Sequence, residues 1–156
     1  MIVQAALWVF ALAVSLMFSQ EFEAQSFALA RHKKLAGVLL VIQGNPEFEA
    51  ASAGRIKPGY RHFIEQLRAE TQAFAGQVVL VHGDSHLQKI DQPLLDERAQ
   101  ALVANFTRVE TFGYPFMGWI KGMVDLKDPK VFRFEPRRWH SASTSPGPSS
   151  SPVPGK

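Results

Sequence analysis

The sequence predicts an α/β fold, and three segments carry that prediction. Residues 38–42 and residues 77–81 are short apolar runs of the kind that form buried strands. Between them, residues 60–74 repeat their apolar side chains at helical spacing. A strand, a helix and a strand joined by short connections form a βαβ unit, in which the two strands are parallel.

Further elements are predicted on both sides of this unit. Residues 21–35 predict a helix that ends near Gly37, because cations gather in its last turn, where they suit the helix dipole. Residues 50–59 lie between the first strand and the next helix and predict a loop. Residues 94–104 predict another helix.

The C-terminal part of the chain predicts an antiparallel meander that continues into a second sheet. Residues 105–112 alternate in polarity, and residues 119–126 and 131–134 also resemble strands. Residues 113–115 and 128–129 contain proline and supply turns. We expect the large aromatic side chains of this part to fill the core of the meander: Phe112, Phe116 and Trp119.

Residues 1–20 contain no charged side chain and are mostly apolar. A helix of that length, at about 1.5 Å per residue, approaches the thickness of a bilayer core of about 30 Å. One interpretation of the segment is a secretory signal with a cleavage point near Ala11 and Ala13, or a membrane anchor. The alternatives are a buried helix or an upstream stretch foreign to the domain. A signal or an anchor predicts an exported or membrane-anchored protein. A buried helix or a foreign stretch predicts a cytoplasmic one.

The predicted organisation is an apolar segment at residues 1–20, one domain at residues 21–140 and a tail at residues 141–156. The tail is mainly Ser, Pro and Gly, which bury too little apolar surface to offset the entropy of ordering, so it predicts disorder. A chain of 156 residues is long enough for one domain with its own core.

Composition excludes several classes of function. The net charge is only +3 and the basic residues are scattered, so no nucleic-acid partner is indicated. Cysteine is absent, which excludes disulfides, thiolate zinc sites and thiol nucleophiles. The sequence does not set the oligomeric state.

Polar side chains follow both strands of the predicted parallel pair. The second strand runs into His82, Asp84 and His86, and the first runs into Gln43 and Asn45. Parallel strands release their carboxyl ends at the same edge of a sheet, where α/β proteins bind ligands. Imidazole, carboxylate and amide groups together are typical of a site for a divalent metal ion.

Five segments together resemble the C-terminal portion of calcineurin-like metallophosphoesterases, within a bacterial branch of that family. The similarity spans residues 26–139. The matching segments are Gln-x-Asn-Pro at residues 43–46, His-Gly-Asp-x-His at residues 82–86, Asp-x-Pro-Leu at residues 91–94, Asn-Phe-Thr-Arg-Val-Glu-Thr-Phe-Gly at residues 105–113 and Phe-Arg-Phe-Glu-Pro at residues 132–136.

The resemblance implies an α/β sandwich with divalent metal ions (Mn, Fe, Zn or Mg), two in an intact relative. Gln43 stands where the family has a lone His ligand, and Asp84 and His86 stand at the two His positions of Gly-His-x-His. Oxygen ligands are harder than imidazole, so these replacements favour Mn or Mg over Zn. Asp84 alternatively orients a neighbouring His, and His82 and Asn45 are expected to contact substrate or to support the ligands.

Two other motifs of the family, Gly-Asp-x-x-Asp and Gly-Asn-His-Glu, have no match in this sequence, and Asp-x-His occurs only as residues 84–86, inside the segment already matched to Gly-His-x-His. Asp-x-His, Gly-Asp-x-x-Asp and Gly-Asn-His-Glu supply its bridging carboxylate, most ligands of the first metal and the proton-donating His. The chain therefore resembles a C-terminal half, and no catalytic residue is assigned. The expected function is a metal-dependent phosphoesterase acting on a small phosphate ester. The alternative is a non-catalytic scaffold or interaction domain, exported or membrane-anchored.

Each candidate site residue also has a purely structural interpretation. His86 can be a loop histidine with ordinary hydrogen bonds, and Asp84 can cap a turn. Gln43 and Asn45 can simply end a strand, since Asn-Pro is a turn signal.

Overall fold

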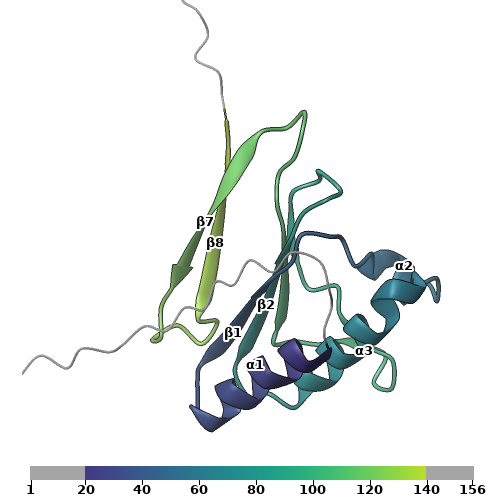
Figure 1. Cartoon of the computed structure of the whole chain (residues 1–156). Coiled ribbons are helices and arrows are strands. Elements are labelled where there is room, and N and C mark those ends of the chain that lie inside the picture. Colours follow the sequence, from purple (N-terminus) through teal and green to yellow (C-terminus); the bar gives the residue numbers. More distant parts are fainter. Residues whose placement is uncertain (1–19, 140–156) are drawn as a thin grey trace, which may run out of the picture.

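The computed structural model describes residues 20–139 and arranges them as two packed layers of strands with helices on one side (Figure 1). The predictions for residues 1–19 and for the tail lie outside this range. In chain order the elements are α1 (Gln20–His32), β1 (Gly37–Val41), α2 (Phe48–Ser52), α3 (Pro58–Gln72), β2 (Gln77–His82), β3 (Lys89–Asp91), β4 (Leu95–Asp96), β5 (Ala101–Leu102), β6 (Phe106–Glu110), β7 (Gly118–Val124) and β8 (Phe132–Arg138).

The main sheet has four strands in the order β1-β2-β6-β3. Strands β1 and β2 are parallel, with Gly37 opposite Gln77 and Val41 opposite Val81. This confirms the predicted βαβ unit, with α3 as its crossover helix. Strand β6 continues the parallel part of the sheet, and β3 is antiparallel to β6.

Helices α1 and α3 cover one face of this sheet (Figure 1). Their apolar residues pack on the alternate strand residues that point toward them, because side chains of a strand alternate between its two faces. The rings of Phe27 and Phe74 meet edge to face at 6.0 Å between centroids. The core on this face includes Phe27, Ile64, Leu67, Val78, Leu80 and Phe106, each no more than 1% exposed.

The β7–β8 hairpin forms a second sheet on the other side of the main sheet (Figure 1). Val79 and Val109 point away from the helices, and each is only 1% exposed, so this face is also covered. At Gly37 the ring of Phe132 lies so close that a β-carbon would collide with it. The predicted antiparallel pairing of the last two strands is confirmed.

The helix predicted at residues 94–104 is wrong. The segment forms a small hairpin of β4 and β5, and the Val103 amide donates to the Leu94 carbonyl at 2.9 Å. Leu94 and Val103 both belong to the main core. A hairpin brings these two ends of the segment together, which one straight helix cannot do.

Two further predictions need correction. Residues 105–112 do not join a meander, because β6 pairs with β2 inside the main sheet and contributes Phe106 to its core. The loop predicted at residues 50–59 starts later than expected, because α2 extends to Ser52. The buried ring of Phe48, 1% exposed, fixes the start of that helix in the core.

Asn105 ties the end of α3 to the sheet. Its side-chain amide lies 3.0 Å from the Thr71 carbonyl, 3.0 Å from the Phe74 carbonyl and 2.9 Å from the Gly76 carbonyl. These carbonyls belong to the end of the helix and the turn into β2, where the helix leaves carbonyl groups without helical partners. One side chain therefore sets the path from α3 into β2.

Replacing Asn105 with Asp should lower the free energy of unfolding by more than about 2 kcal/mol, because a carboxylate cannot donate and an unsatisfied buried group costs roughly 1–3 kcal/mol. Urea unfolding measures the change. Asn45→Asp is the matched control, since the Asn45 side chain accepts a hydrogen bond from the Glu47 amide and a carboxylate can do the same. Equal effects of the two substitutions would contradict the role of Asn105.

Within residues 20–139, no helix is long and apolar enough to cross a membrane.

Candidate functional site

The carboxyl ends of β1 and β2 lie side by side, as predicted. The Ile42 amide donates to the Val81 carbonyl at 3.0 Å, and one step further the Gly83 amide donates to the Gln43 carbonyl at 3.2 Å. The segment that begins at Gln43 and the loop that follows β2 are therefore joined directly at one edge of the sheet.

His86 is held in one orientation at this edge. Its Nδ1 atom lies 2.7 Å from the Tyr114 carbonyl oxygen. A carbonyl only accepts hydrogen bonds, so Nδ1 carries a proton, and in the neutral form of the ring Nε2 is then the nitrogen with the free lone pair. Metal-binding histidines are usually oriented this way, with one ring nitrogen donating to a carbonyl and the other free for the metal.

The His86 ring also packs directly on Gly113. A β-carbon at Gly113 would collide with the imidazole, so only glycine allows this approach. The His86 ring is thus positioned by a hydrogen bond to the Tyr114 carbonyl and by contact with Gly113.

Asp84 and His86 both adopt left-handed backbone conformations, with φ of 80° and 62°. Such angles are uncommon for residues other than glycine, and they tend to gather at functional sites, where the surrounding structure enforces them. The side chains of Gln43, Asp84 and His86 are all exposed. The loop thus presents its two predicted ligands to solvent on a constrained backbone.

In residues 20–139, no three His, Cys, Asp or Glu side chains are grouped closely enough to hold a metal ion. The predicted set contains only two such groups, His86 and Asp84, and its third member is the amide of Gln43.

The other two predicted residues are placed differently. The Asn45 side chain accepts a hydrogen bond from the Glu47 amide at 2.9 Å, which matches its turn-capping interpretation. His82 is 1% exposed, and its ring lies 6.4 Å from that of Phe48. Burial lowers the pKa of His82, although the nearby Glu110 opposes this, so the ring is neutral at pH 7. His82 belongs to the interior behind the edge.

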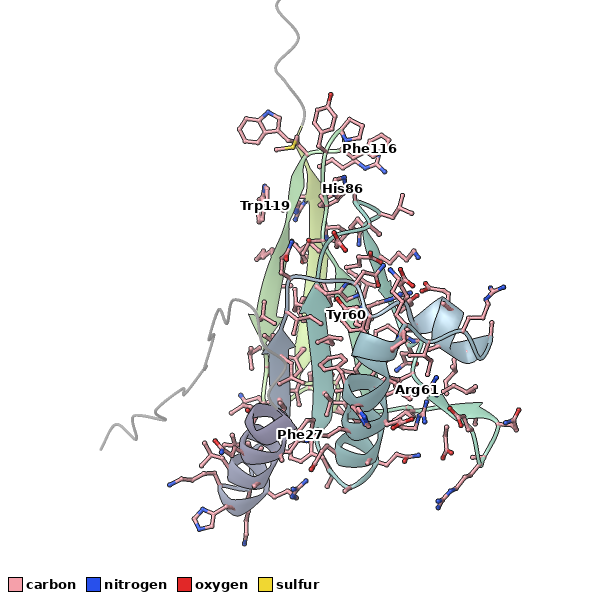
Figure 2. All side chains as sticks on the ribbon, turned by 45° about the vertical axis from the view of Figure 1, so that its right-hand side comes forward. Phe27, Tyr60, Arg61, His86, Phe116 and Trp119 are labelled. Carbon is pink, nitrogen blue, oxygen red and sulfur yellow. The ribbon has the colours of Figure 1, made fainter. Side chains whose placement is uncertain are left out.

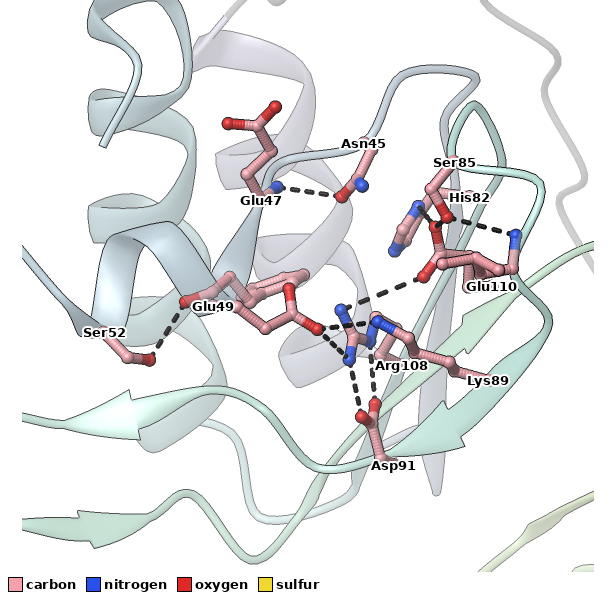
Figure 3. Close-up of polar contacts among 12 residues, drawn as sticks. Asn45, Glu47, Glu49, Ser52, His82, Ser85, Lys89, Asp91, Arg108 and Glu110 are labelled. Atoms are coloured by element: carbon pink, nitrogen blue, oxygen red, sulfur yellow. Dashed lines mark hydrogen bonds and ion pairs between the residues drawn. The ribbon is translucent and has the colours of Figure 1, made fainter. Parts of the chain in front are cut away.

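A buried charged group that the sequence analysis missed lies next to His82 (Figure 3). Arg108 is 1% exposed, and its guanidinium binds both carboxylate oxygens of Asp91, at 2.7 and 2.5 Å. It also donates to Glu49 at 2.8 Å and lies over the Phe48 ring, 5.7 Å from its centroid. Arg108 therefore connects β6, β3 and α2.

The pKa values of these groups reflect that pairing. Burial opposes the charge on Arg108, but its hydrogen bonds to Asp91 and Glu49 outweigh burial and raise its pKa. The hydrogen bond from Arg108 lowers the pKa of Glu49 to about 2. Both groups are therefore charged across the physiological range.

Glu110, two residues after Arg108 on the same face of β6, is fully buried. The Ser85 hydroxyl donates to its carboxylate and in turn accepts a hydrogen bond from the Leu87 amide at 3.2 Å. Arg108 Nη1 lies 4.0 Å from the Glu110 carboxylate. Ser85 stands between Asp84 and His86, so Glu110 anchors the loop that carries both.

One sequence signal could have revealed Arg108 and Glu110. In an alternating strand they share a face with Phe106, a core residue. Charged side chains on the core-facing side of a strand are buried only when they are paired.

Replacing Ser85 with Ala should lower the free energy of unfolding by about 1–3 kcal/mol, because a buried carboxylate oxygen of Glu110 loses its donor. It should also speed hydrogen exchange of the Leu87 amide. Ser52→Ala is the control, because Ser52 is an exposed residue whose hydroxyl donates within its own helix, to the Phe48 carbonyl. An unchanged free energy of unfolding would contradict the anchoring role of Glu110.

A hollow of about 370 Å³ lies elsewhere, between α2, α3 and the β4–β5 turn. Its walls include Arg61, Arg68 and Glu97, and none of the predicted site residues lines it.

No protein-family model matches the chain, and neither the curated proteins nor the solved structures that were searched match it. Function is therefore inferred from the contacts of the chain itself and from the motifs in its sequence.

Proposed function

We propose that this chain carries part of a divalent-metal site for the hydrolysis of a phosphate ester, in a metallophosphoesterase-like α/β sandwich of which it is the C-terminal half. His86 would bind the metal through Nε2, and Asp84 and Gln43 would complete or support the site. The orientation of His86 carries the proposal, because its bond to the Tyr114 carbonyl makes Nε2 the nitrogen with the free lone pair in the neutral ring, and His86 is exposed at a strand end.

The side chains at this edge fit a hard or borderline divalent ion. Imidazole, carboxylate and amide oxygen suit Mn, Fe, Zn or Mg, and the two oxygen donors favour Mn or Mg. A bound ion of this kind lowers the pKa of a coordinated water and polarises a phosphoryl oxygen.

The chain's own residues position this edge. Tyr114 and Gly113 orient the His86 ring, and Glu110 holds the loop through Ser85. The hydrogen bond between Gly83 and Gln43 keeps the two strand ends together. His82 stays neutral in the interior and supports the loop from behind, with Nδ1 3.1 Å from the Gly83 carbonyl.

A second candidate function is a non-catalytic scaffold with the same fold. It is favoured by the sequence, which lacks the family's Gly-Asp-x-x-Asp and Gly-Asn-His-Glu motifs and has no Asp-x-His besides residues 84–86. The two candidates differ in whether the chain hydrolyses a phosphate ester.

Calorimetric titration of the full chain with Mn²⁺ and Zn²⁺ tests the metal site. We expect binding that His86→Ala abolishes. His62→Ala is the matched control, since His62 is an exposed histidine on α3, and it should bind as the unchanged chain does. Equal binding by the His86 and His62 variants would contradict the proposed ligand.

Hydrolysis of bis(p-nitrophenyl) phosphate by the same samples separates the two functions. Metal-dependent turnover that is lost in His86→Ala would support the phosphoesterase. Absence of both metal binding and turnover would support the scaffold.

A further inference from the structure

Large apolar side chains are exposed at the end of the molecule that carries His86. Phe116 and Trp119, predicted to lie in a core, are each 54% exposed, so that prediction is wrong; Phe112 is half-buried. Figure 2 shows Phe116 and Trp119 at the same end as His86. We call this patch the aromatic tip, and its members are Tyr114, Phe116, Met117, Trp119 and Trp139, all more than half exposed.

The aromatic tip is an ordered surface. Gly113 and Phe116 form a β-bridge, and the Trp139 amide donates to the Met117 carbonyl at 2.9 Å. Trp119 lies directly opposite Arg137 in the β7–β8 register, so their side chains share one face of the hairpin. These backbone contacts hold the apolar side chains in place, and their exposure is therefore a property of the fold.

The charge around the aromatic tip has one dominant sign. Residues 113–124 contain no Asp or Glu, and Lys121, Arg137 and Arg138 flank the apolar side chains. Glu135 is the one carboxylate of β8, and it lies 2.8 Å from Arg137 and 3.9 Å from Lys121. Three cations against one carboxylate leave the tip positively charged.

We propose that the aromatic tip inserts into the interfacial region of an anionic lipid bilayer. Trp and Tyr concentrate at that depth because they combine an apolar ring with a polar group. Arg and Lys beside them would meet the negative surface potential of the lipid. Apolar and cationic side chains on a protruding end of the molecule together match this environment.

A second copy of the chain fits the aromatic tip less well. In a symmetric dimer the same patch faces itself, which would bring Lys121, Arg137 and Arg138 of the two copies together. Like charges in such a contact repel each other. An anionic surface instead attracts them.

Quenching of tryptophan fluorescence tests the proposal in the full chain. The sequence has three tryptophans, so Trp8→Phe leaves only Trp119 and Trp139, both in the aromatic tip. The chain is mixed with vesicles of phosphatidylcholine and phosphatidylserine that carry bromine on their acyl chains. We expect the emission to shift to shorter wavelength and to be quenched by the brominated lipid.

Further variants separate the apolar and the cationic contributions. Phe116→Ser with Met117→Ser should abolish the quenching, and Arg137→Gln should weaken partitioning about fivefold. Leu126→Ser is the control, because Leu126 is 64% exposed but lies past the far end of β7. It should leave the quenching unchanged.

Several results would overturn the proposal. One is failure of the chain to bind the vesicles at all, and another is binding without quenching of Trp119 and Trp139. A third is a Leu126 variant that loses as much quenching as the Phe116 and Met117 double variant. Unquenched tryptophans in a vesicle-bound chain would show that another segment makes the contact. They would leave the tip free for a protein partner.

Discussion

Replacing Arg108 with Met is expected to lower the free energy of unfolding by about 3–5 kcal/mol, the usual cost of removing one partner from a buried ion pair. Asp91 and Glu49 are 43% and 56% exposed, so water can solvate them when the guanidinium is gone. Glu110 is fully buried and would lose its nearest cation. The loss is large beside the typical stability of a domain, about 5–15 kcal/mol. Urea unfolding followed by circular dichroism measures it.

Two further variants identify Glu110 as the source of this cost. Adding Glu110→Gln to Arg108→Met should recover part of the lost stability, because a neutral amide is cheaper to bury than an unpaired carboxylate. Arg133→Met is the surface control, since Arg133 is 67% exposed and its pair with Asp128 should contribute at most about 1 kcal/mol. Similar losses in the Arg108 and Arg133 variants would show that Arg108 does not compensate a buried charge.

Replacing Gly113 with Ala is expected to weaken metal binding by about 10–100-fold, the usual effect of disturbing a group that orients a metal ligand. The new methyl group would occupy the space of the His86 ring and push it away from the Tyr114 carbonyl. Titration with Mn²⁺ measures the change in affinity. Displacement of the ring would also show as a change in the imidazole resonances of His86.

Gly59→Ala is the matched control for this substitution. Apart from its chain neighbours and the nearby backbone of its own helix, no atom lies within 4 Å of the position that a β-carbon at Gly59 would take, and alanine suits the first turn of α3. Metal affinity should therefore not change. If Gly113→Ala bound metal as tightly as Gly59→Ala, the contact between Gly113 and His86 would have no role in the site.

The parallel βαβ unit was predictable because its segments show clear local patterns. The apolar runs at β1 and β2 and the helical spacing of α3 each indicate one element, and the short connections leave only a parallel pairing. The segment from Leu94 to Val103 was not predictable in this way. The spacing of its apolar residues is compatible with both a helix and a hairpin. The hairpin forms because Leu94 and Val103 both pack in the main core, whose other residues are distant in sequence.

In the candidate site, too, some features were predictable from local sequence and others depend on distant residues. The convergence of Gln43 with the loop after β2 follows from parallel pairing, so the sequence could predict it. The orientation of His86 depends on Gly113 and Tyr114, which are far from it in sequence. The alternation of β6 places Glu110 on the same face as Phe106, but the residues that surround Glu110 come from other strands and a helix, and the local sequence does not identify them.

The nitrogen chemical shifts of the His86 ring, measured by NMR before and after addition of Zn²⁺, test the central claim most directly. The account predicts that the neutral form of the ring carries its proton on Nδ1 and that its Nε2 resonance moves when the ion is added, while the resonances of His62 stay in place. A ring protonated on Nε2, or a His86 that does not respond to metal at saturating concentration, would contradict it.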